Sequence, residues 1–167
     1  MGPNVTQPAP QGIPQPHVRY QGNSFSLKLY EEWNDQTIHT ILGPVTDGVQ
    51  HNIMIQLDPD AEGMSLTDYA DWQMRSLEEQ LRGCRLLLRQ QIDLTSGLPA
   101  YRAIFSWYPS ENQRLIQEQI YVVAGTKVYR MTATFTKKTR KTIGPAVERM
   151  MLSFNPQAEA PPSQQKR

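Results

Sequence analysis

Seven short strand-like segments, interrupted by a single long helix, restrict what this chain can fold into. In the first segment Phe25, Leu27 and Leu29 alternate with polar residues, which is the period of a strand with one buried face. Six further strands are expected at residues 36–42, 51–57, 85–94, 100–108, 115–123 and 127–136. Strands that follow one another through short connections favour antiparallel pairing.

Turn-forming residues lie between these segments. Gly43-Pro44 and Asp47-Gly48 are expected to turn the chain between the second and third strands. The last two strands are expected to form a tight hairpin across Ala124-Gly125.

The long helix is expected over residues 65–82. Ser65 is a good N-cap, and Asp68 places a negative charge in the first turn. Its apolar stripe is formed by Leu66, Tyr69, Ala70, Leu77 and Leu81. With a shorter helix at about 141–152, the pattern predicts an α+β fold with an antiparallel, curved β-sheet of about six to seven strands.

A glutamine interrupts the apolar stripe of the long helix. Gln73 lies four residues after Tyr69 and four before Leu77, so it points in the same direction as both. Burying a primary amide without partners costs roughly 1–3 kcal/mol. Gln73 therefore either hydrogen-bonds within the chain or marks a site for an apolar ligand that offers polar atoms.

The composition sets limits on domains, location and partners. Residues 1–22 and 155–167 are rich in proline and polar residues and are expected to be a disordered leader and tail around a single domain at 23–154. The 17 basic and 16 acidic side chains leave no electrostatic footprint for nucleic acid or a membrane surface. Without a secretory signal or a long apolar run, the protein is expected in the cytoplasm.

No catalytic or cofactor motif is apparent in the sequence. Phosphate-binding glycine loops and the nucleophile elbow are missing, and the acidic run Asp58–Glu62 lacks the last ligand of a calcium loop. We therefore expect no enzyme activity, no cofactor and no metal. An enzyme that acts through a carboxylate such as Asp35 is the least favoured interpretation.

Polar side chains also occupy one face of two strands. Asn52, Met54 and Gln56 share a face of one strand, and Gln117 and Gln119 share a face of another. Each face could be the solvated side of a sheet.

Several short motifs together resemble the Eag family, the effector-associated chaperones of bacterial type VI secretion. The resemblance begins with Trp33-Asn34-Asp35-Gln36-Thr37-Ile38 and covers about residues 24–154. It continues through Leu66–Tyr69 with Gln73, Ile92-Asp93, Ser96–Tyr101, and Gln117–Gln119 with Tyr121. The wider family includes DcrB-like lipoproteins and resembles the PsbP/Mog1 type of α+β sandwich.

The resemblance implies a homodimeric cytoplasmic chaperone without stable membrane association. Its client would be an effector with N-terminal transmembrane segments and a PAAR domain, often with a prePAAR motif and a Rhs toxin. A largely apolar groove would bind the client helices through Ile38, Thr40, Asn52, Gln56, Gln73 and Gln119. The alternative is a PsbP/Mog1-like adaptor that binds a folded partner by its outer surface.

Overall fold

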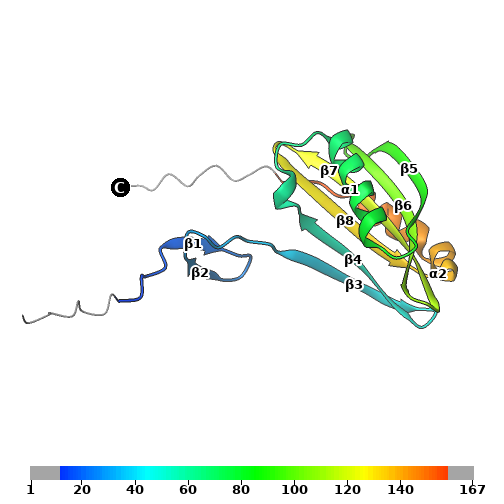
Figure 1. Ribbon diagram of the computed structural model, residues 1–167, viewed down its shortest axis with the longest axis horizontal. Coiled ribbons are helices and arrows are strands. Elements are labelled where there is room, and N and C mark those ends of the chain that lie inside the picture. Colours follow the sequence, from blue (N-terminus) through cyan, green and yellow to red (C-terminus); the bar gives the residue numbers. More distant parts are fainter. Residues whose placement is uncertain (1–11, 158–167) are drawn as a thin grey trace, which may run out of the picture. The chain divides into compact units, whose positions relative to one another are not determined.

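The computed structural model describes residues 12–157 as two compact units, which are drawn in Figure 1. The first unit ends at Asp35, and the second, called the body here, begins at Gln36. Each unit has its own sheet, of two strands and six strands respectively.

The first unit is a β-hairpin. β1 (Val18–Gln21) pairs antiparallel with β2 (Ser26–Leu29), and Val18 lies opposite Leu29. The structure thus differs from the expected leader over residues 1–22, because β1 lies inside that range. The proline-rich composition ends at Pro16 and is followed by good β-formers. Residues 1–11 and 158–167, the outer parts of the expected leader and tail, lie outside the described residues.

The body is an open antiparallel sheet in the order β3-β4-β8-β7-β6-β5. This sheet, the separate hairpin and three α-helices confirm the α+β prediction, and the residues that form each body strand agree closely with the expected segments. The strands are β3 (Ile38–Thr46), β4 (Val49–Leu57), β5 (Arg85–Asp93), β6 (Pro99–Ser110), β7 (Gln113–Ala124) and β8 (Lys127–Phe135).

The β3–β4 hairpin corrects one expected turn. Gly43-Pro44 does not reverse the chain but lies within β3, where the register with β4 shifts between Leu42 and Val45. A proline is tolerated there because β3 is an edge strand. Only Asp47-Gly48 forms the turn, and both residues have positive φ angles, 52° and 76°.

The helices lie on opposite faces of the sheet. α1 (Leu66–Gln80) begins at Ser65, whose hydroxyl accepts a hydrogen bond from the Asp68 backbone N–H as expected. Instead of one helix at 141–152, the chain forms α2 (Lys137–Thr142) and α3 (Gly144–Leu152). Pro145 lacks a backbone N–H and therefore suits the start of a new helix.

Two apolar cores cover the two faces. Tyr69 and Ala70 of α1 pack with Tyr121 of β7, whereas Val147 of α3 packs with Ile120. Because neighbouring residues of a strand point to opposite faces, α1 and α3 lie on opposite sides. Figure 1 shows α1 over β6 and β7, the strands that it contacts. Within the described residues, no α-helix lies over β4 and β3 on that face, whereas the start of β8 is covered, because Val128 packs in the same core as Tyr69 and Ala70.

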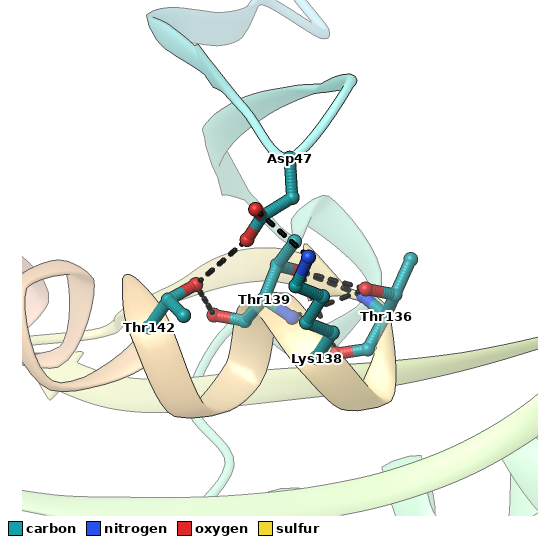
Figure 2. A network of polar contacts seen from close by, with 5 residues as sticks. All are labelled: Asp47, Thr136, Lys138, Thr139 and Thr142. Carbon is teal, nitrogen blue, oxygen red and sulfur yellow. Dashed lines mark hydrogen bonds and ion pairs between the residues drawn. The ribbon is translucent and has the colours of Figure 1, made fainter.

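The tip of the β3–β4 hairpin is held against α2 (Figure 2). Asp47 lies 3.1 Å from the Lys138 Nζ and accepts a hydrogen bond of 3.3 Å from the Thr142 hydroxyl. α2 itself begins with a capping box in which Thr136 and Thr139 exchange hydrogen bonds. These contacts fix the direction of the exposed edge strand.

Candidate functional site

A cleft of about 580 Å³ lies on the α1 face of the sheet, between α1 and the strands that α1 leaves uncovered. Side chains from α1, β4, β7 and β8 line it, together with the turn that contains the 3₁₀ helix η1 (Pro59–Ala61). The lining residues are Gln36, Met54, Gln56, Asp58, Pro59, Asp60, Trp72, Gln73, Ser76, Leu77, Gln80, Gln117, Gln119, Arg130 and Thr132.

The lining is dominated by amides. Six of its residues are glutamines, and they come from α1, β4, β7 and the segment before β3. The family resemblance implies a largely apolar groove, whereas most side chains that line this cleft are polar. Apolar lining comes from Met54, Pro59, Trp72 and Leu77.

Gln73 is the most buried of the α1 residues that line the cleft. Its exposed fraction is only 6%, comparable to the core residue Met74. Its amide makes no hydrogen bond to another group within residues 12–157, but it is not among the fully enclosed polar atoms there that lack a partner, so it reaches the open cleft. Of the two possibilities left by the sequence, an internal partner and a site, the described residues supply no internal partner.

The two glutamines of β7 are partly satisfied by their neighbours. The Tyr121 hydroxyl donates a 2.6 Å hydrogen bond to the Gln119 Oε1, which leaves the amide nitrogen as a donor. The Gln117 Nε2 donates to the Thr134 hydroxyl at 3.0 Å, which leaves the amide oxygen as an acceptor. Burial raises the pKa of Tyr121 well above its ordinary value, so its hydroxyl stays protonated and continues to donate.

A buried polar cluster forms one end of the cleft. The Tyr69 hydroxyl donates to the Asp58 Oδ2 at 2.9 Å, and the Arg130 Nη1 donates to the Tyr69 hydroxyl at 3.4 Å. Arg130 and Asp58 also form an ion pair at 3.6 Å. This cluster joins α1, β8 and the turn before η1.

Five of the six sequence-predicted residues lie on α1 or on the sheet face that α1 covers, but only some of them line the cleft. Gln56, Gln73 and Gln119 line it. Ile38 and Thr40 lie on β3 opposite Gln56 and Met54, so they extend the same face beyond the cleft. The Ile38 side chain is 50% exposed.

Asn52 is separated from the other predicted residues. It lies opposite Leu42 and contributes to a small apolar pocket with Ile41, Ile53 and Val147. Its position at the far end of β4 places it beyond Met54, the last β4 residue at the cleft in that direction.

Sequence reasoning missed Arg130 and Thr132 on β8. The signal was present, because Tyr129, Met131 and Ala133 alternate with these polar residues. An alternating strand shows which residues share a face but not which strand lies beside it. The order β4-β8-β7 was needed to place Arg130 in the cleft.

Neither a metal site nor a membrane-spanning helix is found in the described part of the chain. Within residues 12–157, no group of three or more His, Cys, Asp or Glu side chains is arranged to hold a metal ion. No helix there is long and apolar enough to cross a bilayer.

Comparison with known families identifies the family of this protein. The DcrB family matches residues 25–153, which is most of the chain and includes every residue of the cleft. The chain belongs to the DcrB family. A search of curated proteins found no match.

Two solved structures support the fold. A protein of unknown function from Pseudomonas aeruginosa is 23% identical, with a TM-score of 0.70 over 84% of this chain and 96% of its own. Cyanobacterial PsbP (CyanoP) from Synechocystis is 13% identical, with a TM-score of 0.50 over 90% of this chain and 98% of its own. At these identities the likeness concerns the fold, which is PsbP-like as expected.

Proposed function

We propose that this DcrB-family protein is a cytoplasmic chaperone that binds apolar helices of a client protein in the cleft beside α1. The observation that carries the proposal is Gln73, a residue only 6% exposed whose amide faces an open cleft and has no hydrogen-bond partner in residues 12–157. An amide in this position can exchange water for a hydrogen bond to a bound ligand.

The size of the site suits part of a helix. A helix of 20 residues is about 30 Å long and about 10 Å across, which corresponds to a volume on the order of 2,000 Å³. The cleft of about 580 Å³ therefore holds only a portion of such a helix. The rest would lie along the uncovered face of β3, where Ile38 and Leu42 are 50% and 66% exposed.

Apolar contact would supply most of the affinity. Complete burial of a side chain such as Ile38 or Leu42 contributes roughly 1.5–3 kcal/mol, whereas a neutral hydrogen bond contributes about 0.5–1.5 kcal/mol. The glutamines would select the client. Helices that associate in membranes carry small residues and Ser or Thr, where an amide can approach the backbone.

The proposed client is a type VI secretion effector with N-terminal transmembrane segments, of the prePAAR and PAAR type. This assignment is supported by the motif resemblance from Trp33 to Tyr121 and by the shared face of Ile38, Gln56, Gln73 and Gln119. An exposed apolar helix aggregates in water, so such an effector needs a shield before it is loaded on the secretion spike. We propose that the protein acts as a homodimer and carries out no reaction.

Co-expression with a candidate effector tests the proposal. The full effector should co-purify with the protein, and an effector without its N-terminal apolar region should not. Gln73→Ala and Gln119→Ala should each weaken capture by about three- to tenfold, the loss of one hydrogen bond. Gln90→Ala, which changes an exposed glutamine on β5, is the matched control and should have no effect.

A different pattern would point to the adaptor alternative. Equal capture of both effector forms would refute shielding of apolar helices. If capture also survived both cleft substitutions but was abolished by reversing charges on the outer surface, the protein would bind a folded partner by that surface.

A further inference from the structure

One cation lines the cleft, and it lies at the end formed by the turn before η1. Among the lining residues, Arg130 is the only lysine or arginine. Its side chain is 20% exposed, so the guanidinium is largely enclosed but reachable from the cleft. Its charge offsets that of the buried Asp58 carboxylate, and the part of the guanidinium that faces the cleft can also meet a ligand.

Asp58 and Tyr69 hold the guanidinium by one nitrogen. Nη1 is the atom that approaches both the Asp58 carboxylate and the Tyr69 hydroxyl. Tyr69 in turn donates to Asp58, which fixes the cluster. Nε and Nη2 make no hydrogen bond within residues 12–157. Because a guanidinium has five N–H donors, the three on these two nitrogens remain for a ligand.

The local charge disfavours an anionic ligand. Asp58 balances Arg130, and Asp60 lines the same end of the cleft, so the three side chains sum to a charge of −1 (1 − 2). A client carboxylate would be repelled by the two aspartates. A neutral oxygen acceptor can use the free N–H donors without that penalty.

The end of a helix offers such acceptors. The last four carbonyl groups of an α-helix have no partner inside the helix, and they form the negative end of its dipole. In an apolar segment no charged side chain is present to satisfy them. Arg130 presents N–H donors to these carbonyls from inside the binding cleft.

The other end of the cleft offers different groups. Tyr69 packs on Tyr121 near the start of α1, and Gln80 lies eleven residues further, about 16 Å along the helix. At that end Gln117 keeps its amide oxygen as an acceptor, because its nitrogen already donates to Thr134. An acceptor suits the free N–H groups at the start of a helix.

We propose that the cleft binds an apolar helix in one direction, with the helix C-terminus at Arg130 and its N-terminus toward Gln80. The inference rests on the proposed function and specifies the orientation of the bound segment. The cleft would therefore bind an apolar helix more tightly in this direction than in the reverse direction.

Distance measurements with a simple peptide test the orientation. The probe is a 20-residue Leu/Ala helix with a central Gly-x-x-x-Gly, capped termini and one lysine at each end, spin-labelled at either its first or its last residue. The full chain carries Cys84→Ser and a single label at Glu62→Cys or Glu79→Cys. Both glutamates are exposed and lie outside the cleft lining, toward opposite ends.

The C-terminal label should be closer to position 62, and the N-terminal label closer to position 79. A preference of roughly tenfold is expected, the ratio that one charge-assisted hydrogen bond supports. Arg130→Met should abolish the preference and retain binding, whereas Arg75→Met, at an exposed arginine on α1, should leave it unchanged. The wild-type distances test the orientation even if Arg130→Met fails to fold.

The two proposals can fail separately. If the peptide binds in both directions equally, or with its N-terminus at Arg130, the inference about direction is wrong and the chaperone proposal stands. If neither this peptide nor the effector segment binds, the proposed function is wrong, and the inference falls with it.

Discussion

At the scale of single residues, Gln73 presents an amide at the wall of the cleft. The residue is 6% exposed, and its donors and acceptor have no partner in residues 12–157. The amide is not among the fully enclosed polar atoms there that lack a partner, so water in the cleft can reach it in the free protein. A bound client would replace that water with its own donors and acceptors. Substitution at this residue should therefore affect binding more than stability.

Replacing Gln73 by Met should change the stability of the free protein by less than about 1 kcal/mol and weaken client binding. Met has nearly the same shape, and the amide that it replaces makes no hydrogen bond to another group in residues 12–157. Urea unfolding of the unbound protein measures the change. Gln117→Met is the control and should be destabilising, because that substitution removes the hydrogen bond to Thr134. A Gln73→Met protein that loses as much stability as Gln117→Met would show that the Gln73 amide is satisfied within the chain.

Gln73 could be singled out from the sequence, whereas Arg130 could not. Helical periodicity places Gln73 on the buried face of α1 with no knowledge of any other element. Arg130 required the order of three strands and the position of the turn that carries Asp58. Information of that kind is non-local, and alternation within one strand does not contain it.

At the scale of elements, two tyrosines join α1 to the sheet. Tyr69 packs edge-on against Tyr121, with ring centroids 5.1 Å apart, and both side chains are fully buried. Burial raises the pKa of Tyr69, with Arg130 opposing and Asp58 adding to that shift. Burial likewise raises the pKa of Tyr121. Both phenols therefore lose their protons more easily in the unfolded chain.

Stability should consequently fall at alkaline pH. Below about pH 10, the unfolded pKa of tyrosine, the contribution is complete. As pH rises from there toward the folded pKa values, the free energy of unfolding should fall by about 1.4 kcal/mol per pH unit for each tyrosine. Urea unfolding between pH 9 and 11 measures this slope. Tyr69→Phe should remove the contribution of Tyr69 to the slope. Tyr108→Phe, at an exposed tyrosine, should leave the slope unchanged.

The β3–β4 turn should control the local stability of the edge strand β3. Gly48 has a φ of 76°, and an added Cβ would meet no atom within 4 Å, so Gly48→Ala introduces backbone strain alone. We expect a loss of about 1 kcal/mol. Hydrogen exchange should become faster for β3 amides and stay unchanged in α1. Gly43→Ala, at a glycine without a positive φ, should show neither effect.

Element positions were largely predictable, and the errors occurred where one residue type permits two structures. Proline next to glycine is typical of a turn, yet Gly43-Pro44 lies in β3 because an edge strand has backbone groups that need no partner. Gly144-Pro145 lies inside an otherwise helical pattern and begins a new helix, α3, after α2 has ended at Thr142. Both outcomes depend on what lies beside the segment.

At the scale of the whole molecule, the division at Asp35 was not predictable from composition. The alternation of Phe25, Leu27 and Leu29 indicates a strand but does not identify its partner. The structure pairs this strand with β1 in a hairpin of its own, whereas the sequence predicts one domain over residues 23–154. An isolated two-stranded hairpin is marginally stable in water. The body, by contrast, has two buried cores and the complete cleft.

Removing residues 1–35 should therefore leave a folded body that still binds apolar helices. Every cleft residue lies between Gln36 and Thr132, and the buried cores of the body contain no residue from the hairpin. The shortened chain should unfold cooperatively in urea and bind the spin-labelled peptide with an affinity within about threefold of the full chain, a difference below 1 kcal/mol. Gln73→Ala should weaken that binding as it does in the full chain. If the body stays folded but no longer binds, the exposed apolar side chains of the hairpin, such as Phe25 and Trp33, belong to the client site.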